Sequence, residues 1–117
     1  MVLADTSVWV DYLRRPNDRL LQAMQDRQIL SHPFVIGELA LGGHRVSMSL
    51  LLRKVTPATR ASDEEVLALI HNRGLVGRGI GYVDAHLLAS ALLTPDAGLW
   101  TLDGKLHKVA FEAGVAA

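Results

Sequence analysis

Two acidic residues lie where an amphipathic helix would place apolar ones. In the segment GYVDAHLLASALL, Asp84 falls on the same helical stripe as Leu87 and Leu88. In PFVIGELALGG, Glu38 lies on the stripe of Val35 in the same way. A carboxylate that faces a core costs on the order of several kcal/mol unless it is neutralised, hydrogen-bonded or bound to a cation. The two positions therefore predict inward-facing acids with a chemical role.

Two further acids follow short apolar runs that are typical of strands. Asp5 ends the run VLA and Asp103 ends LWTL. Because the carboxyl ends of parallel strands meet at one edge of a sheet, both side chains should project toward the same crevice. Four carboxylates without a His or Cys partner select Mg²⁺ or Mn²⁺ over zinc. We therefore expect Asp5, Glu38, Asp84 and Asp103 to surround one or two such ions.

Each acid also has a purely structural interpretation. Asp5 and Asp103 could each be the N-cap of the helix that follows. Glu38 and Asp84 could pair with an arginine such as Arg45 or Arg78, or could face water. The coincidence of four acids favours the metal site. Other catalytic groups are weaker: the five histidines show no pair at metal-binding spacing, and no Gly-x-Ser-x-Gly segment supports a serine hydrolase.

The elements that must position these acids alternate along the chain, with no repeat or linker between them. Short strands separated by helices predict one α/β domain over residues 1–117, with a mainly parallel sheet and helices on both faces. Expected strands cover residues 2–4, 29–31 and 98–102, with a weaker one over 54–56. Expected helices cover residues 6–14, 18–27, 33–41, 46–53, 63–72, 81–93 and 104–113.

The composition of the chain indicates which cellular compartment and which kinds of partner are compatible with it. The absence of cysteine excludes disulfides and thiolate sites, and the N-terminus has neither a basic leader nor an uninterrupted apolar segment. No apolar run is long enough to span a bilayer, so we expect a cytoplasmic protein with no membrane partner. The formal net charge is zero, but setting aside the four acids leaves 12 basic against 12 − 4 = 8 acidic residues. A nucleic-acid partner is therefore compatible with the charge balance.

Taken in order, four segments resemble the PIN domain, and most closely the VapC toxins of bacterial toxin–antitoxin pairs. They are DTSVW after the first strand, Glu38 in a mid-chain helix, GYVDAHLLA in a later helix and TLD near the end. The resemblance implies a three-layer sandwich, with a central parallel sheet of four or five short strands flanked by about seven helices. The terminal residues GVAA are short for the last strand of such a sheet.

The resemblance also implies a metal-dependent endoribonuclease. Asp5, Glu38, Asp84 and Asp103 match the acidic positions of the family, and Thr6, Ser7 and Thr101 match its small hydroxyl residues beside them. The implied partners are an RNA substrate, a VapB-like antitoxin whose tail crosses the active-site groove, and a second copy of the chain. Possible contacts with the RNA backbone are Arg14, Arg15, Arg78, Lys105 and Lys108.

Three functional classes follow from these residues. In the first, the acids hold ions that activate water for attack on phosphorus, which leaves 5′-phosphate and 3′-hydroxyl ends. In the second, the protein is a non-catalytic module whose acidic pocket captures an arginine-bearing tail of a partner. A phosphotransfer domain of the receiver kind is the third, but it requires paired acids after the first strand, where Asp5 is followed by Thr6.

Overall fold

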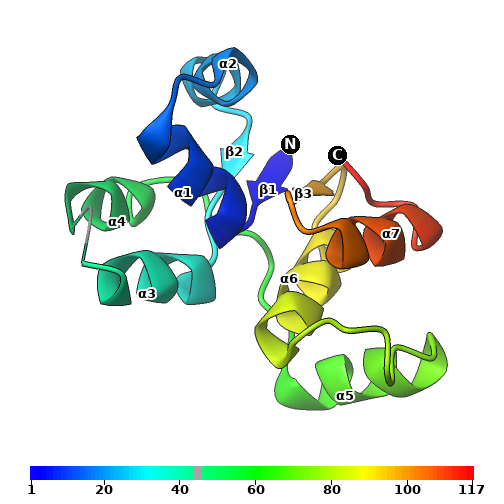
Figure 1. The fold of residues 1–117 in the computed structure, drawn as a ribbon. Helices are drawn as coiled ribbons and strands as arrows, with labels where there is room; N and C mark the ends of the chain where they lie inside the picture. The colour runs from blue at the N-terminus through cyan, green and yellow to red at the C-terminus, as the bar shows by residue number, and fades with distance from the viewer. Residues whose placement is uncertain (44–45) are drawn as a thin grey trace.

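The structure, a computed structural model, describes residues 1–43 and 46–117. His44 and Arg45 lie outside the described residues. The possible ion pair of Arg45 with Glu38 or Asp84 therefore lies outside them as well. The elements follow one another in the chain as shown in Figure 1. They are β1 (Val2–Ala4), α1 (Thr6–Arg14), α2 (Asp18–Gln25), β2 (Ile29–Leu30), α3 (Pro33–Leu41), α4 (Val46–Leu52), α5 (Asp63–Asn72), α6 (Tyr82–Leu93), β3 (Gly98–Trp100) and α7 (Gly104–Glu112).

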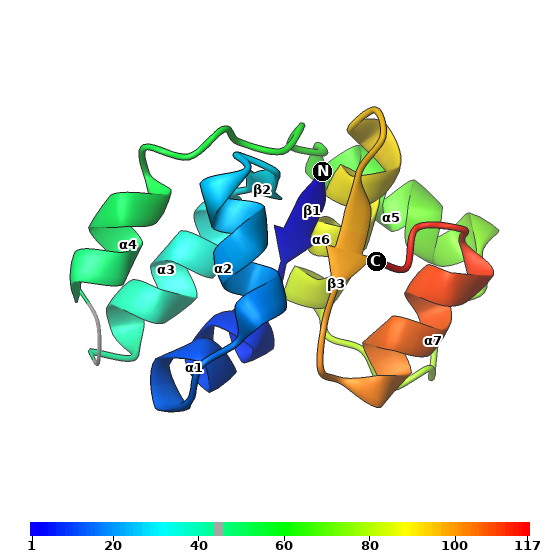
Figure 2. The same cartoon turned by 90° about the horizontal axis from the view of Figure 1, so that it is seen from above.

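A parallel sheet with strand order β2-β1-β3 forms the centre of the molecule. In its register Leu3 of β1 lies opposite Leu30 of β2 and Leu99 of β3. The strands lie between helices when the molecule is viewed from above (Figure 2). The helix α1 contacts β1, while α6 and α7 both contact β3. The predicted α/β architecture with seven flanking helices is therefore confirmed for the described residues.

The number of strands is smaller than predicted. Within the described residues the sheet has three strands, and each edge is extended only by one isolated parallel bridge, Ser31 with Pro57 and Leu99 with Ala116. The expected strand over residues 54–56 is therefore wrong. A proline cannot donate to a ladder, which limits pairing at Pro57. At the C-terminus, two backbone bonds join Leu99 to Val115 and Ala117, so the last residues pair with β3 over a single bridge.

Capping residues set the starts of the helices that carry the site. The side chain of Asp5 caps α1, and that of Asp103 caps α7. Ser62 and Glu65 form a capping box at the start of α5. Three predicted helices, over residues 6–14, 33–41 and 63–72, have the observed bounds, and the other boundaries differ by one or two residues.

The helix α6 runs through the middle of the core. Seven consecutive residues of this helix, from Ala85 to Ala91, are buried, and it packs against both α5 and β3. Leu87 and Leu88 of α6 belong to the same core cluster as the fully buried Trp9, Leu3 and Leu99. Because α6 carries Asp84 in its first turn, this packing fixes the position of that acid against the sheet. In the described part of the chain, no helix has the length and apolar character required to cross a membrane.

Candidate metal centre

Asp5 lies at the carboxyl end of β1, and both of its carboxylate oxygens accept hydrogen bonds. Its side chain is only 5% exposed. Oδ1 accepts from the hydroxyl of Ser7 and from the amide of Val8 at 3.2 Å, while Oδ2 accepts from the hydroxyl of Thr101. The Asp5 amide donates to the carbonyl of Trp100 at 2.9 Å, which joins the end of β1 to the end of β3. The N-cap role considered from the sequence is therefore present together with a buried, oriented carboxylate.

The hydroxyls of Ser7 and Thr101, which donate to Asp5, also accept hydrogen bonds from the loop that carries Asp103. The amide of Leu102 donates to Ser7 Oγ at 3.0 Å, and the amide of Asp103 donates to Thr101 Oγ1 at 3.0 Å. Asp103 itself accepts from the amide of Lys105 at 2.8 Å, which caps α7. One network of hydroxyls and amides thus links Asp5 to Asp103, although the two residues are far apart in the chain.

Glu38 joins the same region through Thr6. The Thr6 hydroxyl donates to Glu38 Oε1 at 2.7 Å, which connects α3 to the first residue of α1. Glu38 is exposed, however, so its prediction as an inward-facing acid is wrong. The buried residues of α3 are Val35 and Leu39, whereas Glu38 lies on an exposed part of this helix, which contacts α1. The possibility that this acid faces water therefore agrees with the structure.

Asp84 is half-buried in the first turn of α6, and the charges of the other three acids raise its pKa. Its Oδ2 accepts from the amide of Gly81 at 3.0 Å. Burial raises the pKa of Asp84 above its usual value, the Gly81 amide opposes this, and the carboxylates of Asp103, Asp5 and Glu38 raise the pKa further. The four predicted acids are therefore gathered around one place in the fold.

The chemistry of these donors fits a hard divalent cation. Asp84 Oδ1, Asp103 Oδ2 and Glu38 Oε2 accept no hydrogen bond from the described residues, and no ion pair in that part of the chain involves the four acids. Unpaired carboxylate oxygens beside one another favour a positive charge. Across residues 1–43 and 46–117, no three His, Cys, Asp or Glu side chains already have the spacing of a metal cage. The acids thus share one electrostatic environment without forming a closed ligand shell.

Two of the predicted RNA-contacting cations have carboxylate partners instead. Arg78 donates to both oxygens of Glu112 at 2.9 and 2.7 Å, so it does not pair with Asp84 or Glu38. The guanidinium lowers the pKa of Glu112. Arg15 pairs with Asp11 one turn earlier at 3.0 Å.

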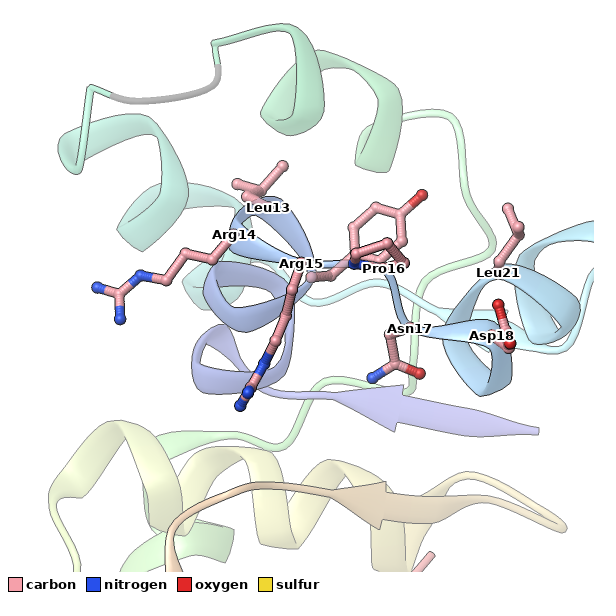
Figure 3. Close-up of a pocket in the computed structure, with 8 residues that line it drawn as sticks. Leu13, Arg14, Arg15, Pro16, Asn17, Asp18 and Leu21 are labelled. Atoms are coloured by element: carbon pink, nitrogen blue, oxygen red, sulfur yellow. The ribbon is translucent and has the colours of Figure 1, made fainter.

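Arg14 and Arg15 lie beside a surface cavity between the end of α1 and the start of α2. This cavity has a volume of about 420 Å³ and is lined by residues 12–18 and Leu21. Figure 3 shows the two arginine side chains leaving the end of α1 in different directions, with Asn17, Asp18 and Leu21 on the α2 side. The cavity is separate from the four acids.

Sequence reasoning missed several contacts around α6. The hydroxyl of Tyr82 donates to Asp63 Oδ1 at 3.1 Å, and Nε2 of the buried His86 lies 3.2 Å from the same oxygen, without the alignment of a hydrogen bond. Asp63 lies in the first turn of α5. The amide of Gly81, which holds Asp84, was also missed. No local pattern signals the contacts of Tyr82 and His86 with Asp63, because they depend on how α5 and α6 pack together, whereas the Gly81–Asp84 contact is a local one between the N-cap and N3 positions of α6.

Comparisons with known proteins agree with this architecture. The family model described as "PIN domain" matches residues 2–112. Two curated relatives, each named "Ribonuclease VapC32", come from Mycobacterium tuberculosis strains CDC 1551 / Oshkosh and ATCC 25618 / H37Rv. Each is 43% identical over 118 residues, which covers 99% of this chain and 95% of the relative. Because the family model spans nearly the whole chain and both relatives are 43% identical over 99% of it, the chain belongs to the PIN domain family.

Proposed function

We propose that this protein is a metal-dependent endoribonuclease and the toxin of a VapC-type toxin–antitoxin pair. The proposal is supported by the hydrogen bonds that join Asp5 to Asp103 through Thr101 and Glu38 to Thr6, and by the charges of these three acids, which raise the pKa of Asp84. The ribonuclease activity is further supported by relatives that carry the name ribonuclease and match nearly the whole chain.

In this proposal Asp5, Asp84 and Asp103 are the ligands of Mg²⁺ or Mn²⁺, and Glu38 acts through water or as a base. A bound ion of this type would acidify and orient a water and would offset negative charge on the leaving oxygen. Ser7 and Thr101 orient Asp5 through its two oxygens, and Thr6 orients Glu38. The exposure of Glu38 leaves this acid accessible to a large substrate.

The proposed reaction is hydrolysis of a phosphodiester bond by water, which leaves 5′-phosphate and 3′-hydroxyl ends. A pocket of carboxylates suits this route because it can hold a cation and accept a proton from water. A 2′,3′-cyclic phosphate on the cleaved RNA would show attack by the ribose of the substrate and would refute the scheme.

The proposed partners are RNA, a VapB-like antitoxin and a second copy of the chain. An arginine from the antitoxin would bind the same free carboxylate oxygens and would block the site, since arginine pairs strongly with carboxylates. Because RNA and the antitoxin are made in the cytoplasm, we place the proposed activity there.

The alternative is a non-catalytic module that uses the acidic pocket to capture such a tail, and the absence of a preformed cage among the described residues favours it. One assay separates the two functions. Purified protein without its partner is incubated with total RNA, with Mn²⁺ or with chelator, beside Asp84→Asn and the control Asp96→Asn, an exposed turn residue with positive φ.

The nuclease proposal predicts cleavage by the parent protein and by Asp96→Asn with Mn²⁺ only, and none by Asp84→Asn. Equal cleavage by all three proteins, with or without chelator, would indicate a contaminating nuclease and leave the binding module in place.

A further inference from the structure

Lys105, unlike Arg15 and Arg78, has no carboxylate partner among the described residues. Arg15 and Arg78 are engaged with Asp11 and Glu112. For Lys105 no carboxylate lies within ion-pair distance in the part of the chain that the structure describes. Its positive charge is therefore available to a ligand.

The backbone and the side chain of Lys105 connect two segments of the site. Its amide donates to Asp103 Oδ1 at 2.8 Å, so the residue begins beside one acid. Its side chain crosses Gly79, where Cδ lies 2.7 Å and Nζ 3.1 Å from the point that a Cβ on Gly79 would occupy. Two residues later, the amide of Gly81 holds Asp84. The ammonium group thus lies against the segment that leads into Asp84.

Gly79 permits this arrangement for two reasons. Its φ of +79° lies in the left-handed region that side chains rarely adopt, and a methyl group would collide with the Lys105 stem. The same loop is also joined to α7 at Arg78, through the ion pair with Glu112. The loop is therefore joined to α7 at two points, the ion pair of Arg78 with Glu112 and the contact of Lys105 with Gly79. The contact of Lys105 is the one nearer the acids.

We infer that Lys105 is a substrate-binding residue that contacts an RNA phosphate next to the cleaved bond. This inference rests on the proposed ribonuclease function. An RNA strand that approaches four carboxylates is repelled by them, and a fixed cation beside the acids lowers this repulsion and sets the position of the strand. The flexible stem and compact charge of lysine suit contact with one phosphate oxygen, without base preference.

The test is RNA binding as a function of salt. All proteins carry Asp84→Asn to prevent cleavage, and a short fluorescein-labelled single-stranded RNA of mixed sequence is titrated by anisotropy at several KCl concentrations. We expect Lys105→Ala to weaken binding by roughly 5- to 10-fold and to reduce the slope of log K against log[KCl] by about 0.7, the value for one phosphate contact on a single strand. Lys105→Arg should keep the slope.

Two further variants make the test specific. Lys54→Ala removes an exposed lysine next to the opposite edge of the sheet and should leave the slope unchanged. Gly79→Ala keeps every charge but displaces the Lys105 stem, so it should lose affinity as Lys105→Ala does. Thermal melts establish that each variant is folded.

The outcomes separate this inference from the proposed function. Without Asp84→Asn, Lys105→Ala should raise KM and leave kcat nearly unchanged. If RNA is cleaved but Lys105→Ala binds with the parent slope, or if Lys108→Ala causes the larger loss, the Lys105 inference is wrong and the nuclease function stands. If no RNA is cleaved while the slope still depends on Lys105, the phosphate contact stands and the nuclease function fails.

Discussion

Replacing Thr101 by valine should destabilise the protein and weaken metal binding together. The Thr101 hydroxyl donates to Asp5 Oδ2 and accepts from the amide of Asp103 at 3.0 Å, and its side chain is only 6% exposed. Valine has nearly the same shape, so the change removes these two bonds without creating a cavity. A hydrogen bond to a charged group contributes roughly 1.5–3 kcal/mol, and the bond from the Asp103 amide about 1 kcal/mol.

The expected loss of folding free energy is therefore roughly 2–4 kcal/mol. At about 2.1 cal/mol/K per residue, the unfolding entropy of this 117-residue chain is about 0.25 kcal/mol/K, so Tm should fall by roughly 8–16 °C. Urea unfolding and calorimetry measure both quantities, and a Mn²⁺ titration should show affinity reduced about 10- to 100-fold.

Thr101→Ser is the matched control, because it keeps the hydroxyl. It should retain most of the stability and the Mn²⁺ affinity. A Thr101→Val variant within about 0.5 kcal/mol of the parent would show that this hydroxyl does not orient Asp5, and the network that links Asp5 to Asp103 would lose its assigned role.

Three further predictions concern charges. The folded pKa of Asp84 is raised, so the stability that this residue contributes is present below its unfolded pKa of 3.8 and is lost as the pH rises through the folded pKa. At neutral pH the metal-free Asp84→Asn variant should therefore be more stable than the parent protein in urea unfolding. A less stable variant would contradict this. Burial, followed by the nearby charges of His86 and Arg60, lowers the pKa of His32 from 6.5 to about 4. The free energy of unfolding should therefore fall by up to roughly 3 kcal/mol as the pH drops from 6.5 to 4. The variant His32→Asn keeps a side chain that can cap α3, and its stability should lack this fall in a pH series. The exposed pair of Arg78 with Glu112 should show a coupling below about 1 kcal/mol in a double-mutant cycle, and a larger coupling would mean that the pair fixes the loop more strongly than its exposure suggests.

The parts of the fold that the sequence predicted well are those with local signals. The bounds of the helices that begin at Thr6 and Asp63 follow from Asp5 and Ser62, whose side chains cap them directly. Strand number was harder to predict, because whether Pro57 or Ala116 extends the sheet depends on neighbours from distant segments.

The roles of the four acids stay a prediction, and the structure bears on their burial. The argument from an apolar stripe agrees with the half-buried Asp84, but it also placed Glu38 inward, although this residue is exposed beside α1. The partner of Arg78 lies 34 residues away on α7, and no helical period connects the two. Charge partners and exposed edges depend on packing between elements, which periodicity within one element does not contain.

The most direct test of the central claim is a crystal structure of the protein grown with Mn²⁺ and measured for anomalous scattering. The four-carboxylate account predicts a strong peak within coordination distance of oxygens from Asp5, Asp84 and Asp103, which disappears in crystals of Asp84→Asn. A protein that cleaves RNA with Mn²⁺ but shows no peak between these residues, or shows one only at another place, would contradict it.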